Sequence, residues 1–185
     1  EVPVDIAVSH SITPFITTYP WSSAGFGTKY ANPGTTPGSL SAGCTFSPSG
    51  TVLAVCSNSS PYISAYAWSA SGFGAKFANP ATLPTSSGRS VAFSPSGTEI
   101  AVAHLTSPRI TTYPWNGSGF GTKYANPGTL PTGDGNGVAF SPAGTEIAVA
   151  HTTNPFITTY PWSGSGFGTK YANPGTLPTG QGNSV

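Results

Sequence analysis

Three histidines at one position of a repeated segment are the first side chains in this chain that could do chemistry. His10, His104 and His151 are separated by multiples of 47 residues, and Ser57 takes the equivalent place in the remaining copy. Three imidazoles can bind a metal ion when they converge on one point. Each of these imidazoles follows an apolar run in a separate copy, so we expect hydrogen-bonded structural histidines and no metal site.

The two cysteines occur together in a single predicted hairpin of the repeat. Cys44 stands where the third copy has Val91, and Cys56 stands where it has Ala103. A hairpin register that sets large residues opposite small ones pairs these two positions across neighbouring strands. Such a pair is somewhat wider than a disulfide requires, but it can adjust. We therefore expect either a disulfide, which would indicate an oxidising compartment, or two small buried thiols.

The carboxylates are spread over the repeats and are not grouped. Asp5, Glu99 and Glu146 occupy equivalent positions in three different copies. None is therefore placed to pair with another for acid–base chemistry, and no nucleophile stands beside a base. Gly-x-Gly strings such as Gly119–Gly121 follow a turn and open no helix, so they predict no nucleotide loop. On these grounds the sequence predicts no enzyme and no cofactor.

A repeat of 47 residues is the element that must position all of these side chains. The segment 93–104 returns almost unchanged as 140–151. The same spacing holds for the four tryptophans, Trp21, Trp68, Trp115 and Trp162. A fixed period of this length indicates a solenoid, a propeller or an array, because a single copy cannot bury its own apolar face.

Each copy is expected to form four short strands. In the third copy they cover residues 90–94, 98–104, 110–115 and 121–125. The first turn contains Pro-Ser-Gly and the third contains Asn-Gly-Ser-Gly, which are residues typical of tight turns. Regular short strands with Gly-rich turns predict an all-β fold, a β-propeller of four-stranded antiparallel blades, with about four blades in this chain.

The chain is expected to be a single repeat array. It begins with a second strand and stops two residues into a first strand, so the phenylalanine that ends each first strand is missing from the last copy. We expect either a fragment of a longer array or half of an eight-bladed ring that self-association completes. The array covers residues 1–185, with copies at about 1–44, 45–91, 92–138 and 139–185.

The hairpin sequence Val-Ala-Phe-Ser-Pro-Ser-Gly-Thr-Glu-Ile-Ala-Val-Ala, residues 91–103, resembles the first two strands of WD-repeat and YVTN-type propeller blades. The similarity covers this hairpin and the third strand in each copy, and the near-identity of the copies suggests recent amplification of one blade. Tyr113-Pro114 stands where a WD-repeat has its Trp-Asp pair, and the Gly-His pair is absent. The resemblance implies the propeller fold and no specific family activity. A YVTN-lactonase type of enzyme is disfavoured, because acidic metal ligands are lacking.

Composition narrows the classes of partner. Charged residues are only 6% of the chain and the net charge is +1. Nucleic acid and anionic membranes are recognised by basic patches, so neither is expected as a partner. No apolar run has the length of a membrane span. Low charge and a surface rich in Ser, Thr, Gly and Asn favour an extracellular or virion-surface location.

Differences between the copies are concentrated in two kinds of loop. These are the loop after the second strand and the loop that leads into the next copy, which emerge on the same face of an up-and-down sheet. Loops on a rigid scaffold commonly carry binding residues. The residues that we expect to bind a ligand on this face are Asn58, Tyr62, Arg109, Asp134, Asn136 and Gln181.

These loops lead to the functional expectation. The sequence predicts a non-catalytic binding or structural module that recognises carbohydrate or protein through one rim of the propeller. The alternative is a virion or extracellular filament component whose propeller serves assembly.

Overall fold

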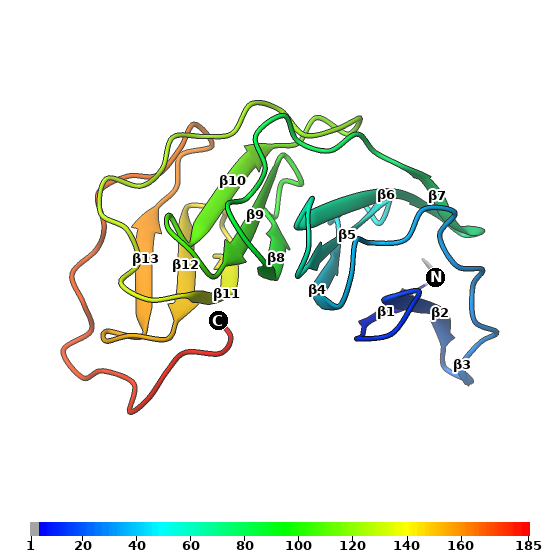
Figure 1. The fold of residues 1–185 in the computed structure, drawn as a ribbon, viewed down its shortest axis with the longest axis horizontal. Helices are drawn as coiled ribbons and strands as arrows, with labels where there is room; N and C mark the ends of the chain where they lie inside the picture. The colour runs from blue at the N-terminus through cyan, green and yellow to red at the C-terminus, as the bar shows by residue number, and fades with distance from the viewer. Residues whose placement is uncertain (1–3) are drawn as a thin grey trace.

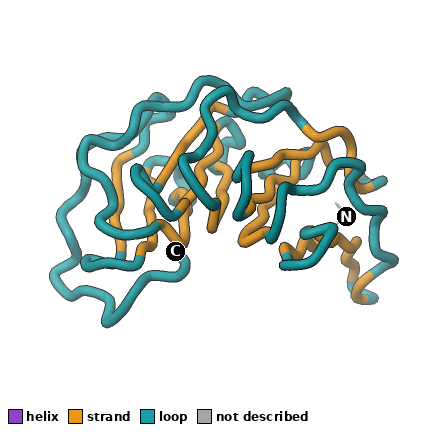
Figure 2. The backbone as a smooth tube through the Cα atoms, viewed as in Figure 1, coloured by secondary structure: helices purple, strands orange, loops and turns teal. Residues whose placement is uncertain are grey.

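All regular structure in residues 4–185, the part of the chain that the computed structural model describes, is β-strand. The strands form four antiparallel sheets that follow one another along an arc (Figure 1). Figure 2 shows that long loops run along the outer side of this arc and connect each sheet to the next. No helix in this part of the chain is long and apolar enough to cross a membrane. The all-β, propeller-like fold with about four blades is therefore confirmed.

Each sheet is a meander in which strands adjacent in sequence are hydrogen-bonded neighbours. The first sheet contains β1 (Val4–Ser9), β2 (Ile16–Ser22) and β3 (Gly25–Phe26). The second contains β4 (Ser41–Phe46), β5 (Val52–Ser57), β6 (Ile63–Ser69) and β7 (Gly72–Lys76). The third contains β8 (Gly88–Phe93), β9 (Glu99–His104) and β10 (Ile110–Pro114). The fourth contains β11 (Gly135–Phe140), β12 (Glu146–His151) and β13 (Ile157–Pro161).

In the second and third sheets, the strand next to the innermost one is the most deeply buried element. Every residue of β5 and of β9 is buried. Their sequences are nearly continuous apolar runs, as expected for strands that are covered on both faces. Each of these strands lies between an inner strand and an outer strand of its own sheet, and adjacent sheets pack against its two faces.

The hairpin register differs by one residue from the sequence expectation. Val91 pairs with Val102 and Phe93 with Ile100, so that large residues face large residues. The turn determines this register: Ser94 donates its backbone N–H to the carbonyl of Glu99, and Gly97 adopts a φ of 73° inside the turn. Matching side-chain volumes was therefore the wrong criterion, because turn geometry fixes hairpin register.

The fourth strand is fully formed only in the second sheet. The third and fourth sheets keep a single bridge at this position, Trp115 to Phe120 and Trp162 to Phe167. The third strand carries Ala67 in the second sheet, whereas the third sheet has Pro114 at the same place. Proline has no N–H to donate to an outer strand, so the substitution accounts for the difference. The expected strand 121–125 is consequently absent.

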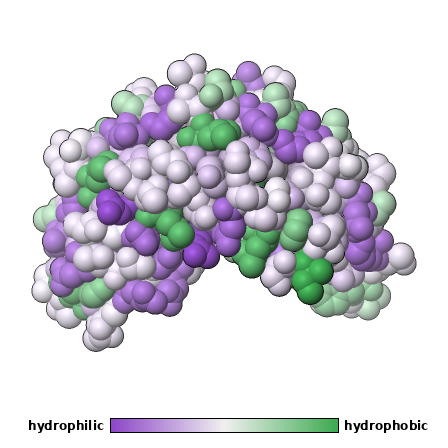
Figure 3. Space-filling view, in the orientation of Figure 1, coloured by the Kyte–Doolittle hydropathy of each residue, from purple (hydrophilic) through white to green (hydrophobic). Residues whose placement is uncertain are grey.

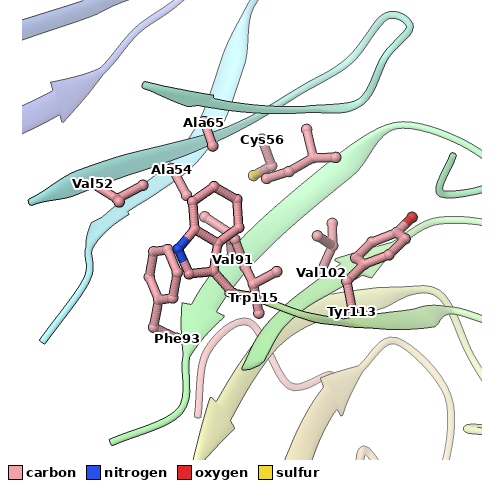
Figure 4. Close-up of a cluster of buried hydrophobic side chains, with 11 residues drawn as sticks. Val52, Ala54, Cys56, Ala65, Val91, Phe93, Val102, Tyr113 and Trp115 are labelled. Carbon is pink, nitrogen blue, oxygen red and sulfur yellow. The ribbon is translucent and has the colours of Figure 1, made fainter. Parts of the chain in front are cut away.

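Aromatic side chains fill the space between adjacent sheets. Between the second and third sheets, Trp115 packs edge-on against Phe77 and Phe93, with ring centroids 5.0 and 5.9 Å apart. Figure 4 shows Trp115 pointing toward Val52 and Ala54 of the second sheet. The core of the molecule is thus a series of layers between sheets, in which Trp68, Trp115 and Trp162 are packing residues.

The corrected register separates the two cysteines. Cys44 pairs with Val55, and Cys56 pairs with Gly43. Cys44 packs toward the first sheet while Cys56 belongs to the layer between the second and third sheets. Both thiols are free. The disulfide expected as one of two possibilities is not formed, because neighbouring positions along a strand point to opposite faces.

Alkylation of the native protein tests this arrangement. Burial raises the pKa of the Cys56 thiol to about 12. At pH 8 the reactive thiolate of Cys56 should therefore be about a thousandfold scarcer than in an unperturbed cysteine. Mass spectrometry should find two iodoacetamide adducts after denaturation without reductant, and slow labelling of Cys56 before it. A native mass two hydrogens lighter than that of the reduced chain would contradict the free thiols.

Candidate functional site

The two kinds of variable loop lie on the same side of the molecule and bind one another. We call this side the loop rim; it consists of residues 58–62, 105–109 and 152–156 together with the loop ends 38–42, 85–89, 132–136 and 179–183. Asn58 donates its backbone N–H to Leu40 at 3.0 Å, and Thr152 does the same to Asp134 at 3.1 Å. The rim is therefore a continuous hydrogen-bonded surface that crosses the junctions between sheets.

Each loop after a second strand is a turn of fixed shape. Tyr62 and Arg109 hold φ angles of 65° and 68°, in the left-handed region that non-glycine residues rarely adopt. Their backbones are fastened at both ends: Arg109 donates to Thr106 at 2.7 Å and accepts from His104 at 3.0 Å. Phe15 and Phe156 take the same conformation in the other copies. The turn thus presents one large side chain per sheet at a defined place on the rim.

Arg109 lies at the junction between the third and fourth sheets. Its Nη1 donates to the carbonyl of Pro131 at 3.2 Å, while its Nε is buried without a hydrogen-bond partner. Burial is the main cause that lowers the pKa of both His104 and His151, and the positive charge of Arg109 acts in the same direction. The guanidinium therefore lies where the third sheet meets the loop that leads into the fourth.

The histidines beneath the rim hold the strands together. In all three, Nε2 lies 2.9 Å from a threonine Oγ1 on the following strand: His10 with Thr17, His104 with Thr111 and His151 with Thr158. His104 and His151 are fully buried. Burial lowers the pKa of His104 to about 4 and lowers that of His151 as well, so both are neutral at pH 7. This hydrogen bonding gives the histidines a structural role.

Asp134 immediately precedes Gly135, the residue that approaches Arg109, in the loop that leads into β11. Its backbone N–H donates to Thr152 Oγ1 at 3.1 Å, which fastens it to the fourth sheet. The next residue, Gly135, lies so close to the Arg109 carbonyl that any side chain there would collide with it. Asp134 is half-buried, and no hydrogen bond or ion pair of its carboxylate is found in residues 4–185. The fold thus brings Arg109 and Asp134 to one junction.

The other expected site residues occupy different junctions. Asn58 and Tyr62 lie between the second and third sheets, where Ser87 Oγ donates to the Asn58 carbonyl at 2.8 Å. Asn136 donates through Nδ2 to the Gly182 carbonyl at 2.9 Å, beyond the fourth sheet. Gln181 is exposed beside it. The six residues therefore do not form one site; they divide into three pairs along the rim.

Arg89 belongs to the rim and was not among the expected residues. It follows Gly88, which pairs with His104, and the ladder shifts between Gly88 and Ser90, so Arg89 is the residue of a β-bulge. Bulges re-aim side chains and are frequent beside functional sites. The Nε of Arg89 is also buried without a partner. A signal was present in the sequence, since the copies carry Ala42, Arg89, Asn136 and Asn183 at this position.

The cationic groups of the chain are divided between two locations. Both arginines lie at the rim end of the third sheet, on either side of His104 in the ladder. Each lysine instead donates to the asparagine three residues later: Lys29 to Asn32, Lys76 to Asn79, Lys123 to Asn126 and Lys170 to Asn173. In residues 4–185, no three His, Cys, Asp or Glu side chains are grouped to hold a metal ion. The rim therefore offers guanidinium groups and one carboxylate as its reactive side chains.

Comparison with known proteins finds a solved structure with a similar fold. No family model matches this chain, and no curated protein resembles it in sequence. Among solved structures it is similar to a candidate 6-phosphogluconolactonase from Bacteroides uniformis, with 14% identity and a TM-score of 0.64. The match covers 83% of this chain and 49% of the other, so this chain spans about half the length of that structure. At this identity the likeness shows the fold alone.

This comparison corrects the functional expectation. A non-catalytic binding or structural module was expected, with a virion or filament component as the alternative, and enzymatic activity was not expected. The fold is instead shared with a protein named as a candidate enzyme. The expectation was wrong because it searched for catalytic pairs within one repeat. A propeller places residues of neighbouring repeats at one junction, and function depends on such sites and not on the fold.

Proposed function

We propose that the junction between the third and fourth sheets binds a negatively charged sugar lactone and hydrolyses it. The observation that carries this proposal is the placement of both arginines, Arg89 and Arg109, at one end of the third sheet, where both side chains are half-buried. A planar guanidinium binds carboxylate and phosphate in a fixed, two-pronged geometry. The name of the structural neighbour supplies the substrate class, the lactone of a phosphorylated sugar acid.

The reaction needs one base and one group that stabilises negative charge. In this proposal the Asp134 carboxylate takes a proton from water, and the water oxygen bonds to the lactone carbonyl carbon. The carbonyl oxygen becomes an oxyanion, for which the Arg109 guanidinium is the nearby positive group. The ring C–O bond then breaks, and the proton returns to the ring oxygen as it leaves. The product is the open hydroxy acid, and no oxidant or further reactant is consumed.

His104 is not the base in this proposal. Its Nε2 is bonded to Thr111, and its Nδ1 lies 3.3 Å from Thr85 Oγ1, so neither ring nitrogen is open to a substrate. Asp134, in contrast, is half-buried at the surface. A general base must reach the proton that it removes, which favours the carboxylate over the imidazole.

Lactone hydrolysis by rim variants tests the proposal. The repeat itself provides substitutions that the fold already accepts: Asp134→Ser copies Ser87, Arg109→Tyr copies Tyr62, and Arg89→Asn copies Asn136. With 6-phosphogluconolactone we expect Asp134→Ser to lower kcat by roughly 100-fold or more. We expect Arg89→Asn mainly to raise KM for the phosphorylated lactone and to change it little for gluconolactone. Arg109→Tyr should instead lower kcat for both lactones, because it removes the positive group beside the oxyanion.

The control is Lys123→Gln, whose side chain binds Asn126 away from the rim. This variant should keep the native rate. Hydrolysis should be followed by NMR at a pH where the spontaneous reaction is slow. A native protein that gives no rate above the spontaneous one would refute the proposal, and so would an Asp134→Ser variant with unchanged kcat.

A further inference from the structure

The same aromatic contact closes every junction between adjacent sheets. One sheet contributes an aromatic residue that follows its outer edge, and the next sheet contributes a tryptophan. The ring centroids are 5.2, 5.0 and 5.2 Å apart at the three junctions, in the pairs Tyr30–Trp68, Phe77–Trp115 and Tyr124–Trp162. The junctions are therefore interchangeable interfaces with two distinct halves.

The two ends of the arc expose opposite halves of this contact. Tyr171 follows the fourth sheet and is 45% exposed, whereas Trp21 of the first sheet is 40% exposed. The three tryptophans inside junctions are only 4–6% exposed. Val8 in β1 is 47% exposed, although its counterparts in β5, β9 and β12 are fully buried. Each end thus exposes apolar surface, and the opposite end carries the residue that covers such surface at the internal junctions.

The backbone is complementary at the two ends as well. β1 pairs only with β2, so its inner edge lacks the strand that covers β5, β9 and β12 in the other sheets. An unpaired edge presents a row of free N–H and C=O groups. Figure 3 shows that hydrophobic side chains gather along the inner side of the arc over this sheet and the next.

The missing inner strand begins at the opposite end of the arc. Gly182 donates its backbone N–H to the His151 carbonyl at 3.0 Å, and Ser184 lies against Gly137 as Ser90 lies against Gly43. Residues 182–185 therefore occupy the place of a first strand beyond the fourth sheet. Figure 1 shows this segment on the inner side of the arc, next to β11.

We infer that the β1–β3 end of one chain docks on the 171–185 end of a second copy, and that two copies close head to tail into an eight-bladed ring. Four sheets make an arc in Figure 1, and the match to the structural neighbour covers about half of that longer chain. A head-to-tail interface forms a ring when its rotation closes. In the ring, Tyr19 would donate to the Thr176 carbonyl of the second copy, as Tyr113 donates to Thr82 and Tyr160 to Thr129. This inference is independent of the proposed hydrolase site, which lies within one chain.

Light scattering coupled to size-exclusion chromatography measures the mass of the species. We expect twice the 18.7 kDa of one chain, unchanged as the protein concentration rises. Trp21→Asp and Tyr171→Asp, which alter opposite ends, should each weaken the association by at least about 30-fold. Circular dichroism of each variant should keep the strand signal, because both side chains are already partly exposed at the ends of a single chain. Ser118→Asp, in an exposed turn of the third sheet, is the control of equal charge and should remain dimeric.

Three outcomes would overturn the inference. The first is a native chain that stays monomeric, and the second is an assembly whose mass grows without limit as concentration rises. The third is a dimer that survives both aspartate variants. Acrylamide quenching provides a further check, since one of the four tryptophans should become accessible only when the dimer is dissociated by dilution. A failed lactonase assay leaves this inference standing, and a monomeric chain leaves the lactonase proposal standing.

Discussion

Replacement of Trp115 by Ala should lower the free energy of unfolding by about 3–5 kcal/mol, because it empties the layer between two sheets. Trp115 is 4% exposed and contacts Phe77, Phe93 and Phe120 through edge-on ring geometry. The second and third sheets pack against each other through these rings. No neighbouring side chain is therefore placed to fill the space that the indole leaves. Denaturant unfolding followed by circular dichroism gives the free-energy difference.

Trp115→Phe is the matched variant for this prediction. It keeps an aromatic ring in the same layer and should cost clearly less than the alanine. A loss below about 1 kcal/mol for Trp115→Ala would show that the layer can collapse around the missing ring, and would contradict the packing role assigned to the repeated tryptophan.

Acid should destabilise the fold through its buried histidines. The pKa of His104 is lowered to about 4 from the ordinary 6.5, mainly by burial. Between these two pH values the unfolded chain binds a proton that the folded chain does not, so stability falls as pH drops from about 6.5 to about 4. At about 1.4 kcal/mol per unit, the loss is about 3 kcal/mol for this residue. The lowered pKa of His151 acts in the same direction.

The second sheet supplies the control for the acid effect. Ser57 and Ser64 stand where the third sheet has His104 and Thr111, so the double variant His104→Ser/Thr111→Ser introduces a pair that the fold already contains. Between pH 6.5 and 4 the unfolding free energy of this variant should change with pH less steeply than that of the native chain. The difference in slope should correspond to about one proton fewer taken up on unfolding. A His104 resonance that titrates near pH 6.5 in the folded protein would contradict the prediction.

The period of 47 residues was sufficient to predict the fold. Each copy carries its own apolar runs and turn residues, such as the run in β9 and the glycine at position 97. These are local signals; the apolar run occurs four times and the turn glycine three times. The sequence also predicted that the two kinds of variable loop lie on the same face. In a sheet whose strands alternate in direction, every second connection emerges on the same side. Arg109 and Asp134 were identified in this way.

The tertiary structure decided the features that depend on more than one strand. Turn hydrogen bonds at Ser94, and not side-chain volumes, fixed the hairpin register, and this shift placed Cys44 and Cys56 on opposite faces. The bulge at Arg89 depends on the pairing of Gly88 with His104 and of Ser90 with Ala103, which no single strand reveals.

The candidate site was likewise decided by the contact between sheets. Arg109 and Asp134 belong to different connections of the array, and their proximity requires the loop into the fourth sheet to close against the third. Gly135 permits this approach, because only a residue without a side chain fits against the Arg109 carbonyl. Local sequence patterns determine which strands form. How closely neighbouring sheets approach depends on packing between distant residues, and this approach is what assembles the site.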